Sequence, residues 1–212
     1  HTWIEFINRL LGALAGLATL LLLISALGRL KNDFWAAVGS LMILLGMGFQ
    51  GWLGKTVVDS NLLPYKITIH LFMAFLILLI LIILLAREHT IKKQIPNASQ
   101  LKWIITGGLV LTIIQIGMGT QVRQFVDGQV HSFNLIEASQ WLSSPPLLFY
   151  FHRSFSILVL LVHGYIGYLL FKNNHIPIVF KLILFLLGVE VLTGIWIYYF
   201  DFPFSSQALH LV

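Results

Sequence analysis

Long apolar segments separated by short polar ones run along the whole chain. A helix needs about 20 predominantly apolar residues to cross the hydrocarbon core of a bilayer, and several of these segments approach or exceed that length. The pattern predicts six complete spanning helices, at residues 7–28, 34–54, 67–86, 102–121, 148–171 and 178–200, and the start of a seventh near Ser206. We therefore expect an all-α fold, a polytopic transmembrane helical bundle.

Composition agrees with this fold class. Only 10% of the residues are charged and 58% are hydrophobic, with a mean hydropathy of +0.90, whereas soluble domains carry about 25% charged residues. The chain has no cysteine, which excludes disulfides and thiolate ligands. The net charge of +5 fits basic loops of a membrane protein better than nucleic-acid binding. No cleavable signal peptide is expected, because the opening residues lack a charged start followed by a short apolar core.

The basic residues predict how the chain crosses the membrane. Three loops with a concentration of Lys and Arg fall on one side if the helices alternate, namely residues 29–33, 87–102 and 172–181. The positive-inside rule places these loops in the cytoplasm. In a cell inner membrane, the opposite ends of the helices then face the periplasm.

The chain also contains an internal repeat. In each half a polar residue followed by arginine opens a helix, and a glycine stands sixteen positions before a histidine. The matching positions are Asn8-Arg9, Gly54 and His70 in the first half, and His152-Arg153, Gly194 and His210 in the second. The repeat predicts two similar helical halves, residues 1–95 and 96–212.

The predicted topology brings the repeated polar positions to one depth in the membrane. Asn8, His70, His152 and His210 all fall at the outer ends of their helices. Neutral imidazole is a common iron ligand, and histidines on facing helices can hold a haem from both sides. We predict that His152 and His210 bind the iron of one haem and that His70 is a metal ligand in the first half. The alternative for a single histidine is a ring in the lipid headgroup region.

Position 8 distinguishes the two halves. The repeat predicts histidine there, but Asn8 is an amide that ligates iron poorly, with Glu5 one helical turn before it. One imidazole beside a carboxylate suits substrate binding better than electron storage, and Glu5 could relay a proton. Arg153, and Arg9 at the matching position, could bind haem propionates. Snorkelling to lipid phosphates is the alternative for both arginines.

Other polar residues have simpler expected roles. His163 lies eleven residues after His152, about 16 Å further along a helix, too far to bind the same iron. Gln50 and Glu190 each precede a histidine of the repeat by twenty residues. Hydrogen bonds between helices are expected for both, with proton relay as the alternative for Glu190. The histidines expected in loops are His89, His131 and His175.

Several runs resemble signatures of the haem A synthase family. They are EFINRLLG (5–12), GFQGWLG (48–54), LPYKITIH (63–70), QIGMGTQVR (115–123), FHR (151–153), LTGI (192–195) and ALH (208–210). Their order and spacing are similar to the family's over essentially the whole chain. The chain departs from the family at Asn8, where the Glu-x-x-His-Arg motif has histidine, and it lacks the cysteine pair of some members.

The resemblance implies a fold and an activity. The fold is eight transmembrane helices in two similar four-helix halves, of which this chain would begin at the second helix and stop inside the eighth. The activity is oxidation of the C8 methyl of haem O to a formyl group, giving haem A for terminal oxidases. A haem b would be held by His152 and His210, and the substrate haem O would bind near His70 and Glu5. Haem O carries a farnesyl tail, so a site open to lipid is expected; haem O synthase and an electron donor are candidate partners.

Two other classes of function fit parts of the pattern. A non-enzymatic dihaem electron carrier of the b type would also use paired histidines, but it requires four good ligands, and Asn8 argues against that. A transporter built from repeats would favour broken helices at mid-depth, whereas the residues singled out here lie at the outer edge. The sequence does not indicate an oligomeric state.

Overall fold

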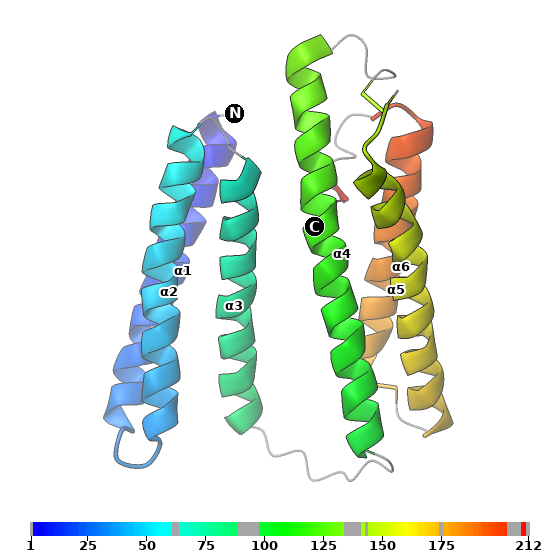
Figure 1. Cartoon of the computed structure of the whole chain (residues 1–212). Coiled ribbons are helices and arrows are strands. Elements are labelled where there is room, and N and C mark those ends of the chain that lie inside the picture. The colour runs from blue at the N-terminus through cyan, green and yellow to red at the C-terminus, as the bar shows by residue number, and fades with distance from the viewer. Residues whose placement is uncertain are drawn as a thin grey trace. The chain divides into compact units, whose positions relative to one another are not determined.

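Helices make up nearly all of the described part of the chain. The computed structural model describes residues 2–60, 64–88, 98–133, 141–142, 144–173, 176–202 and 209–210. Within these ranges lie α1 (Thr2–Gly28), α2 (Phe34–Asp59), α3 (Pro64–Glu88), α4 (Ala98–Phe133), α5 (Leu147–Lys172) and α6 (Ile178–Tyr199) (Figure 1). All six are long and apolar enough to cross a membrane. The predicted polytopic helical bundle is confirmed, and the chain is an integral membrane protein. Most of the predicted seventh helix lies outside the described residues.

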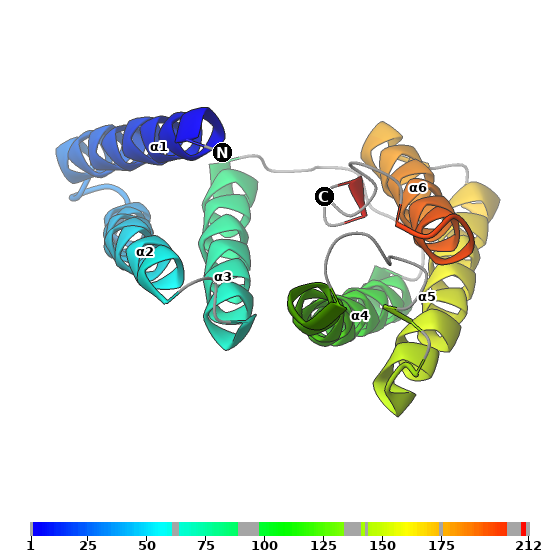
Figure 2. The same cartoon turned by 90° about the horizontal axis from the view of Figure 1, so that it is seen from above.

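The helices form two compact units, His1–Lys92 and Lys93–Val212. In the first unit α2 packs against α1 and α3, and in the second α5 packs against α4 and α6; Figure 2 views the helices from above. Consecutive helices within a unit run in opposite directions (Figure 1). The start of α1, the end of α2 and the start of α3 therefore lie at one end of the first unit. The predicted boundary between residues 95 and 96 lies outside the described residues.

Local sequence features set the ends of several helices. The Asp33 side chain caps α2 by accepting a hydrogen bond from the backbone N–H of Ala36, at 3.1 Å. Pro146 and Pro177 immediately precede α5 and α6, where the missing N–H of proline breaks no helical hydrogen bond. After α6, Asp201 adopts a φ of 53°, a left-handed conformation that cannot continue a right-handed helix.

The fourth helix is longer than its predicted span of residues 102–121. It continues to Phe133, and Arg123 Nε bonds Asp127 Oδ2 at 3.3 Å, one helical turn apart. This ion pair and the lack of proline allow polar residues to remain helical beyond the apolar segment. The expectation that His131 lies in a loop is therefore wrong, because it belongs to α4. The other two histidines expected in loops, His89 and His175, lie outside the described residues.

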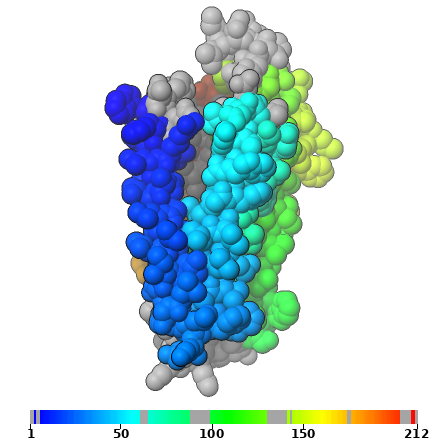
Figure 3. Space-filling view, turned by 90° about the vertical axis from the view of Figure 1, so that its left-hand side faces the viewer, coloured from blue at the N-terminus to red at the C-terminus, as the bar shows by residue number. Residues whose placement is uncertain are grey.

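Apolar side chains cover the outside of the units as well as their interior. Figure 3 shows α1 and α2 side by side on one face of the first unit. Both helices carry large exposed apolar side chains along their length, among them Leu10, Leu14, Leu17, Leu21, Met42 and Leu45. Large apolar side chains exposed along the whole length of two helices are unusual on soluble proteins but suit contact with lipid tails.

An ion pair closes the other end of the first unit. Arg87 Nη2, in the last turn of α3, donates to Asp33 Oδ1 at 3.1 Å. The turn between α1 and α2 and the end of α3 thus lie at the same end of the unit. The alternating topology predicted from the basic loops requires this placement.

Candidate functional site

The rings of His152 and His210 lie close together in the second unit. His152 is in the second turn of α5 and His210 follows α6, so residues 58 positions apart in sequence converge. Their ring centroids are 6.3 Å apart, with the planes at 82°. An iron between two imidazoles, with metal–nitrogen bonds of about 2 Å, places the ring centres roughly 6 Å apart. The spacing of these two rings therefore fits a pair of axial ligands on one iron.

The end of α6 fixes the orientation of the His210 ring. Nδ1 lies 3.0 Å from the backbone oxygen of Glu190, 3.1 Å from Thr193 Oγ1 and 3.3 Å from Glu190 Oε2. The Thr193 hydroxyl itself donates to the Glu190 backbone oxygen at 3.0 Å, so Nδ1 faces acceptors and carries the proton. The Nε2 lone pair is then left for a metal.

Glycines let two helix backbones approach these histidine rings closely. A Cβ on Gly194 of α6 would lie 2.9 Å from Cε1 of His210, and a Cβ on Gly119 of α4 would lie 3.1 Å from Cε1 of His152. Side chains at these positions would push the rings away. In the first unit, a Cβ on Gly54 of α2 would lie 3.4 Å from Cε1 of His70. Each of the three histidines therefore packs on a glycine of another helix.

Two glutamines bind the backbone of the histidine-bearing helices. Gln50 Nε2 donates to the backbone oxygen of His70 at 3.0 Å, so the hydrogen bond between helices predicted for Gln50 is present. Gln115 Nε2 donates to the backbone oxygen of His152 at 3.1 Å. Both bonds hold a histidine-bearing helix at a fixed height against its neighbour.

Sequence reasoning missed the contacts of Gln115 and Gly119 with His152. The repeat has a sixteen-residue interval between glycine and histidine, but 33 residues separate Gly119 from His152 because the long α4 and the segment after it intervene. A usable signal was present within the helix. Gln115 precedes Gly119 by four residues, as Gln50 precedes Gly54.

The first unit brings together fewer of the predicted residues. The described contacts of His70 run to Gln50 and Gly54 of α2, while Asn8 and Arg9 lie on α1 with exposed side chains. Glu5 also belongs to α1, but its side chain lies outside the described residues. The roles of Glu5 and Asn8 beside His70 remain predictions.

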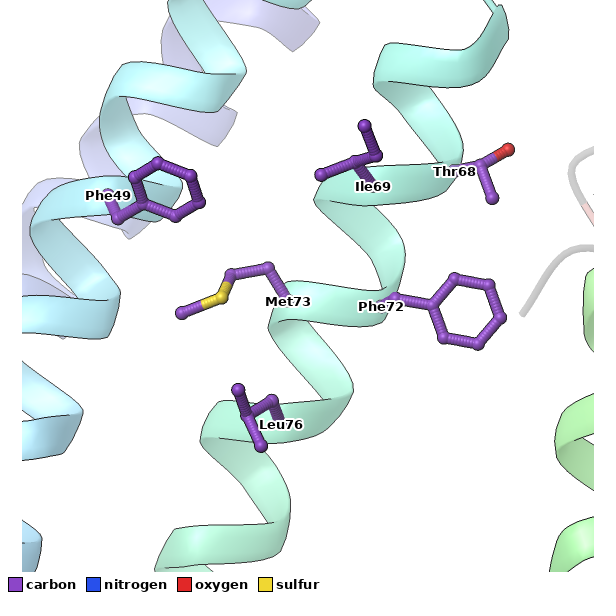
Figure 4. A pocket seen from close by; sticks show the side chains of 6 residues that line it. All are labelled: Phe49, Thr68, Ile69, Phe72, Met73 and Leu76. Carbon is purple, nitrogen blue, oxygen red and sulfur yellow. The ribbon is translucent and has the colours of Figure 1, made fainter.

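An apolar groove lies between α2 and α3, next to His70 in sequence. It has a volume of about 300 Å³ and is lined by Phe49, Thr68, Ile69, Phe72, Met73 and Leu76. Figure 4 shows Ile69, Met73 and Leu76 on the side of α3 toward Phe49, and Thr68 and Phe72 pointing the other way. This α2–α3 groove suits an apolar chain rather than a charged group.

Aromatic rings surround the arginine next to His152. The guanidinium carbon of Arg153 lies 6.0 Å from the ring centre of Phe149, 5.6 Å from that of Tyr150 and 5.7 Å from that of Tyr198. Distances of about 6 Å allow favourable cation–π contact. The rings keep the charged group near the first turns of α5, beside His152.

His163 is separate from the pair of histidines. It is buried in α5, and its Nδ1–H donates to the backbone oxygen of Val159 at 2.9 Å. Eleven residues of helix, about 16 Å, separate it from His152, consistent with its predicted exclusion from the same iron. Among the residues that the structure describes, no group of three or more His, Cys, Asp and Glu side chains is placed to hold a metal ion.

Known proteins resemble this chain over its whole length. The family described as cytochrome oxidase assembly protein, COX15-CtaA, matches residues 1–212. The heme A synthase of Bartonella tribocorum is 26% identical over 235 residues, a match that covers 98% of this chain and 65% of that protein. The chain thus spans just under two thirds of the length of this curated relative. No solved structure matches. With a full-length family match, this chain belongs to the COX15-CtaA family of cytochrome oxidase assembly proteins.

Proposed function

We propose that the chain acts in haem A synthesis, by oxidising the C8 methyl of haem O to a formyl group. Membership of the COX15-CtaA family and the similarity to a heme A synthase support an assignment to haem A synthesis. The observation that carries the proposal is the 6.3 Å separation of the His152 and His210 rings. It fits an iron held by two imidazoles, an arrangement that suits a haem with two axial histidines.

In the second unit, His152 and His210 would hold a haem b through their Nε2 atoms. The acceptors around His210 Nδ1 keep the proton away from the ligating nitrogen, and Gly119 and Gly194 leave room for the rings. Arg153 would bind a propionate, since guanidinium pairs well with carboxylate. These residues clamp and orient the cofactor.

In the first unit, the substrate haem O would bind beside His70. The α2–α3 groove is apolar and begins one residue from His70, so it suits the farnesyl tail. Arg9 would bind a propionate, as Arg153 does in the second unit, with Asn8 next to it. One imidazole and an amide would hold the iron less tightly than two imidazoles. The substrate could then enter the site and the product could leave it.

Converting a methyl group to a formyl group removes electrons and adds an oxygen atom, and amino-acid side chains supply neither an oxidant nor that oxygen. An external electron acceptor and an oxygen donor are needed, and bound haem would supply the redox centre at which they act. The side chains of this chain would bind and orient the two haems. Glu5 would accept a proton at the reacting centre. We place the reaction near the periplasmic face of a cell inner membrane, because the positive-inside rule puts the basic loops in the cytoplasm.

The test is to express the full chain in cells with and without a supply of haem O and to extract the pigments. The proposal expects haem A only when haem O is available, and no haem A from the His152→Ala variant. His163→Gln, a change at a histidine of the same helix outside the pair, is the control and should still yield haem A. Two haem b per chain with no haem A under either condition would instead indicate a dihaem electron carrier.

A further inference from the structure

A polar residue stands four positions before each glycine that contacts a predicted ligand. The three sets are Gln50, Gly54 and His70; Gln115, Gly119 and His152; and Glu190, Gly194 and His210. Residues four apart lie on the same face of a helix. Each histidine therefore packs against one face of another helix that presents a glycine and, one turn earlier, a polar side chain.

In each of the two glutamine sets, the amide oxygen of the glutamine and Nδ1 of the histidine make no hydrogen bond. The glutamine Nε2 donates to the histidine backbone, which leaves the glutamine Oε1. Among the described residues, Gln115 Oε1 and His152 Nδ1 are both buried without a hydrogen-bond partner, and so are Gln50 Oε1 and His70 Nδ1. Buried polar atoms are rarely left unpaired in proteins. An amide oxygen is an acceptor, and Nδ1 becomes its donor once Nε2 has bound a metal.

The glutamate set already makes the corresponding contact. Glu190 Oε2 lies 3.3 Å from His210 Nδ1, which also bonds the Glu190 backbone oxygen at 3.0 Å. Glu190 occupies in this set the position that Gln50 and Gln115 occupy in the other two. Its side-chain oxygen lies within reach of Nδ1. The contact shows how the same helical arrangement can fix the ring.

From these three sets we propose that Gln50, Gln115 and Glu190 are positioning residues for His70, His152 and His210. Their side-chain oxygens accept the Nδ1–H, which directs Nε2 to the iron. Histidines that bind metals almost always donate their other ring N–H to a carboxylate, a carbonyl or water, and this partner fixes the tautomer and raises the basicity of the ligand. The inference rests on the proposed function, because it requires haem at these histidines.

The second unit offers the sharpest consequence. With haem bound, the two axial ligands there would have different partners. His152 would donate to the amide oxygen of Gln115, and His210 would share its Nδ1–H between the backbone oxygen and the carboxylate of Glu190. Hydrogen bonds to a carboxylate are stronger than those to a neutral amide. His210 is therefore the more electron-donating ligand, which stabilises the oxidised iron and lowers the midpoint potential of the haem.

The experiment is a redox titration of the haem bound to the full chain, purified in detergent. Glu190→Gln should retain the haem and raise its midpoint potential. Gln115→Glu also removes the Nε2 donor to the His152 backbone oxygen. Where haem is retained it should lower the potential, because a carboxylate replaces the amide oxygen as the partner of His152 Nδ1. Opposite shifts from two variants are not expected from a loss of folding or packing. If one variant does not fold, the other still gives a shift of predicted sign.

Two further variants separate positioning from general damage. Gln115→Leu removes the Oε1 acceptor together with the Nε2 donor to the His152 backbone oxygen, and should weaken haem retention by about 10- to 100-fold. Gln100→Leu, which changes an exposed glutamine of the same helix, should leave retention and potential unchanged. If both Glu190→Gln and Gln115→Glu bind haem with the midpoint potential of the wild type, the positioning role is wrong. The proposed function would still stand in that case. A wild-type chain that binds no haem would overturn the proposed function as well.

Discussion

The two units place a histidine against a glycine in the same way but differ in the residues around it. In the second unit, two imidazoles meet at 6.3 Å, and each contacts a glycine of another helix. In the first unit, His70 has the matching glycine, but Asn8 stands where the repeat of His152 is expected. Under the proposed function, this one residue would separate a site that keeps its haem from a site whose haem exchanges.

Removing one imidazole of the second unit should have the largest effect. His210→Ala leaves an iron with a single protein ligand, and haem retention should fall by more than about 100-fold, beyond the loss expected for a residue that only supports a ligand. Haem per chain, measured on the purified protein, checks this. His70→Ala should leave the haem of the second unit in place. Equal losses from both variants would remove the distinction between the units.

Restoring histidine at position 8 should make the first unit resemble the second. Asn8→His offers a second imidazole, so we expect the haem b content to rise from one to about two per chain, with less haem A formed. Pigment extraction and the absorption spectrum measure both quantities. Asn8→Gln is the matched control, because it keeps the amide and should not add haem. An unchanged haem content in Asn8→His would show that the units differ in more than this residue.

The glycine contacts should give a graded series. The Cβ added by Gly194→Ala would come within 2.9 Å of a ring atom, that of Gly119→Ala within 3.1 Å and that of Gly54→Ala within 3.4 Å. Overpacking costs about 1–3 kcal/mol, so the haem affinity of the second unit should fall more for Gly194→Ala than for Gly119→Ala. Gly54→Ala reaches only ordinary contact distance, in the first unit, and should leave that affinity unchanged. Gly188→Ala, on α6 with open space around its Cβ, is the control. Equal effects across the series would contradict the assigned contacts.

The smallest effect is expected far from the histidines, at the ion pair of the first unit. Arg87→Ala removes an exposed contact to Asp33, and such pairs contribute about 0–1 kcal/mol. Asp33→Ala also removes the cap of α2 and should cost about 1 kcal/mol more. Thermal unfolding in detergent measures both. Haem content of the second unit should not change in either variant.

Hydropathy predicted the helices because lipid imposes length and polarity on every spanning segment. It failed at residues 122–133, where an ion pair and the absence of proline continue α4 outside the apolar region. In that region, helix formation depends on local side-chain pairs that a window of average hydropathy does not detect.

The histidines could be selected from the sequence because the repeat kept the same interval in both halves. The sequence could not give the 6.3 Å spacing of their rings, which depends on how α5 and the residues after α6 pack. It also missed the packing of Gly119 on His152, since that contact joins helices across an irregular interval. Roles for Glu5 and Asn8 came from the resemblance and the repeat, and the Asn8→His variant tests that of Asn8.

Asp33 Oδ1 has two partners that arrive at different times during synthesis. It accepts from the N–H of Ala36 within the same turn and from Arg87, 54 residues later. Chains are made and begin to fold from the amino end, so the bond to Ala36 can form as soon as the second helix enters the membrane. The bond to Arg87 has to wait until the third helix has been inserted. An accessibility probe at Arg87 during translation would therefore report when this three-helix unit is completely assembled.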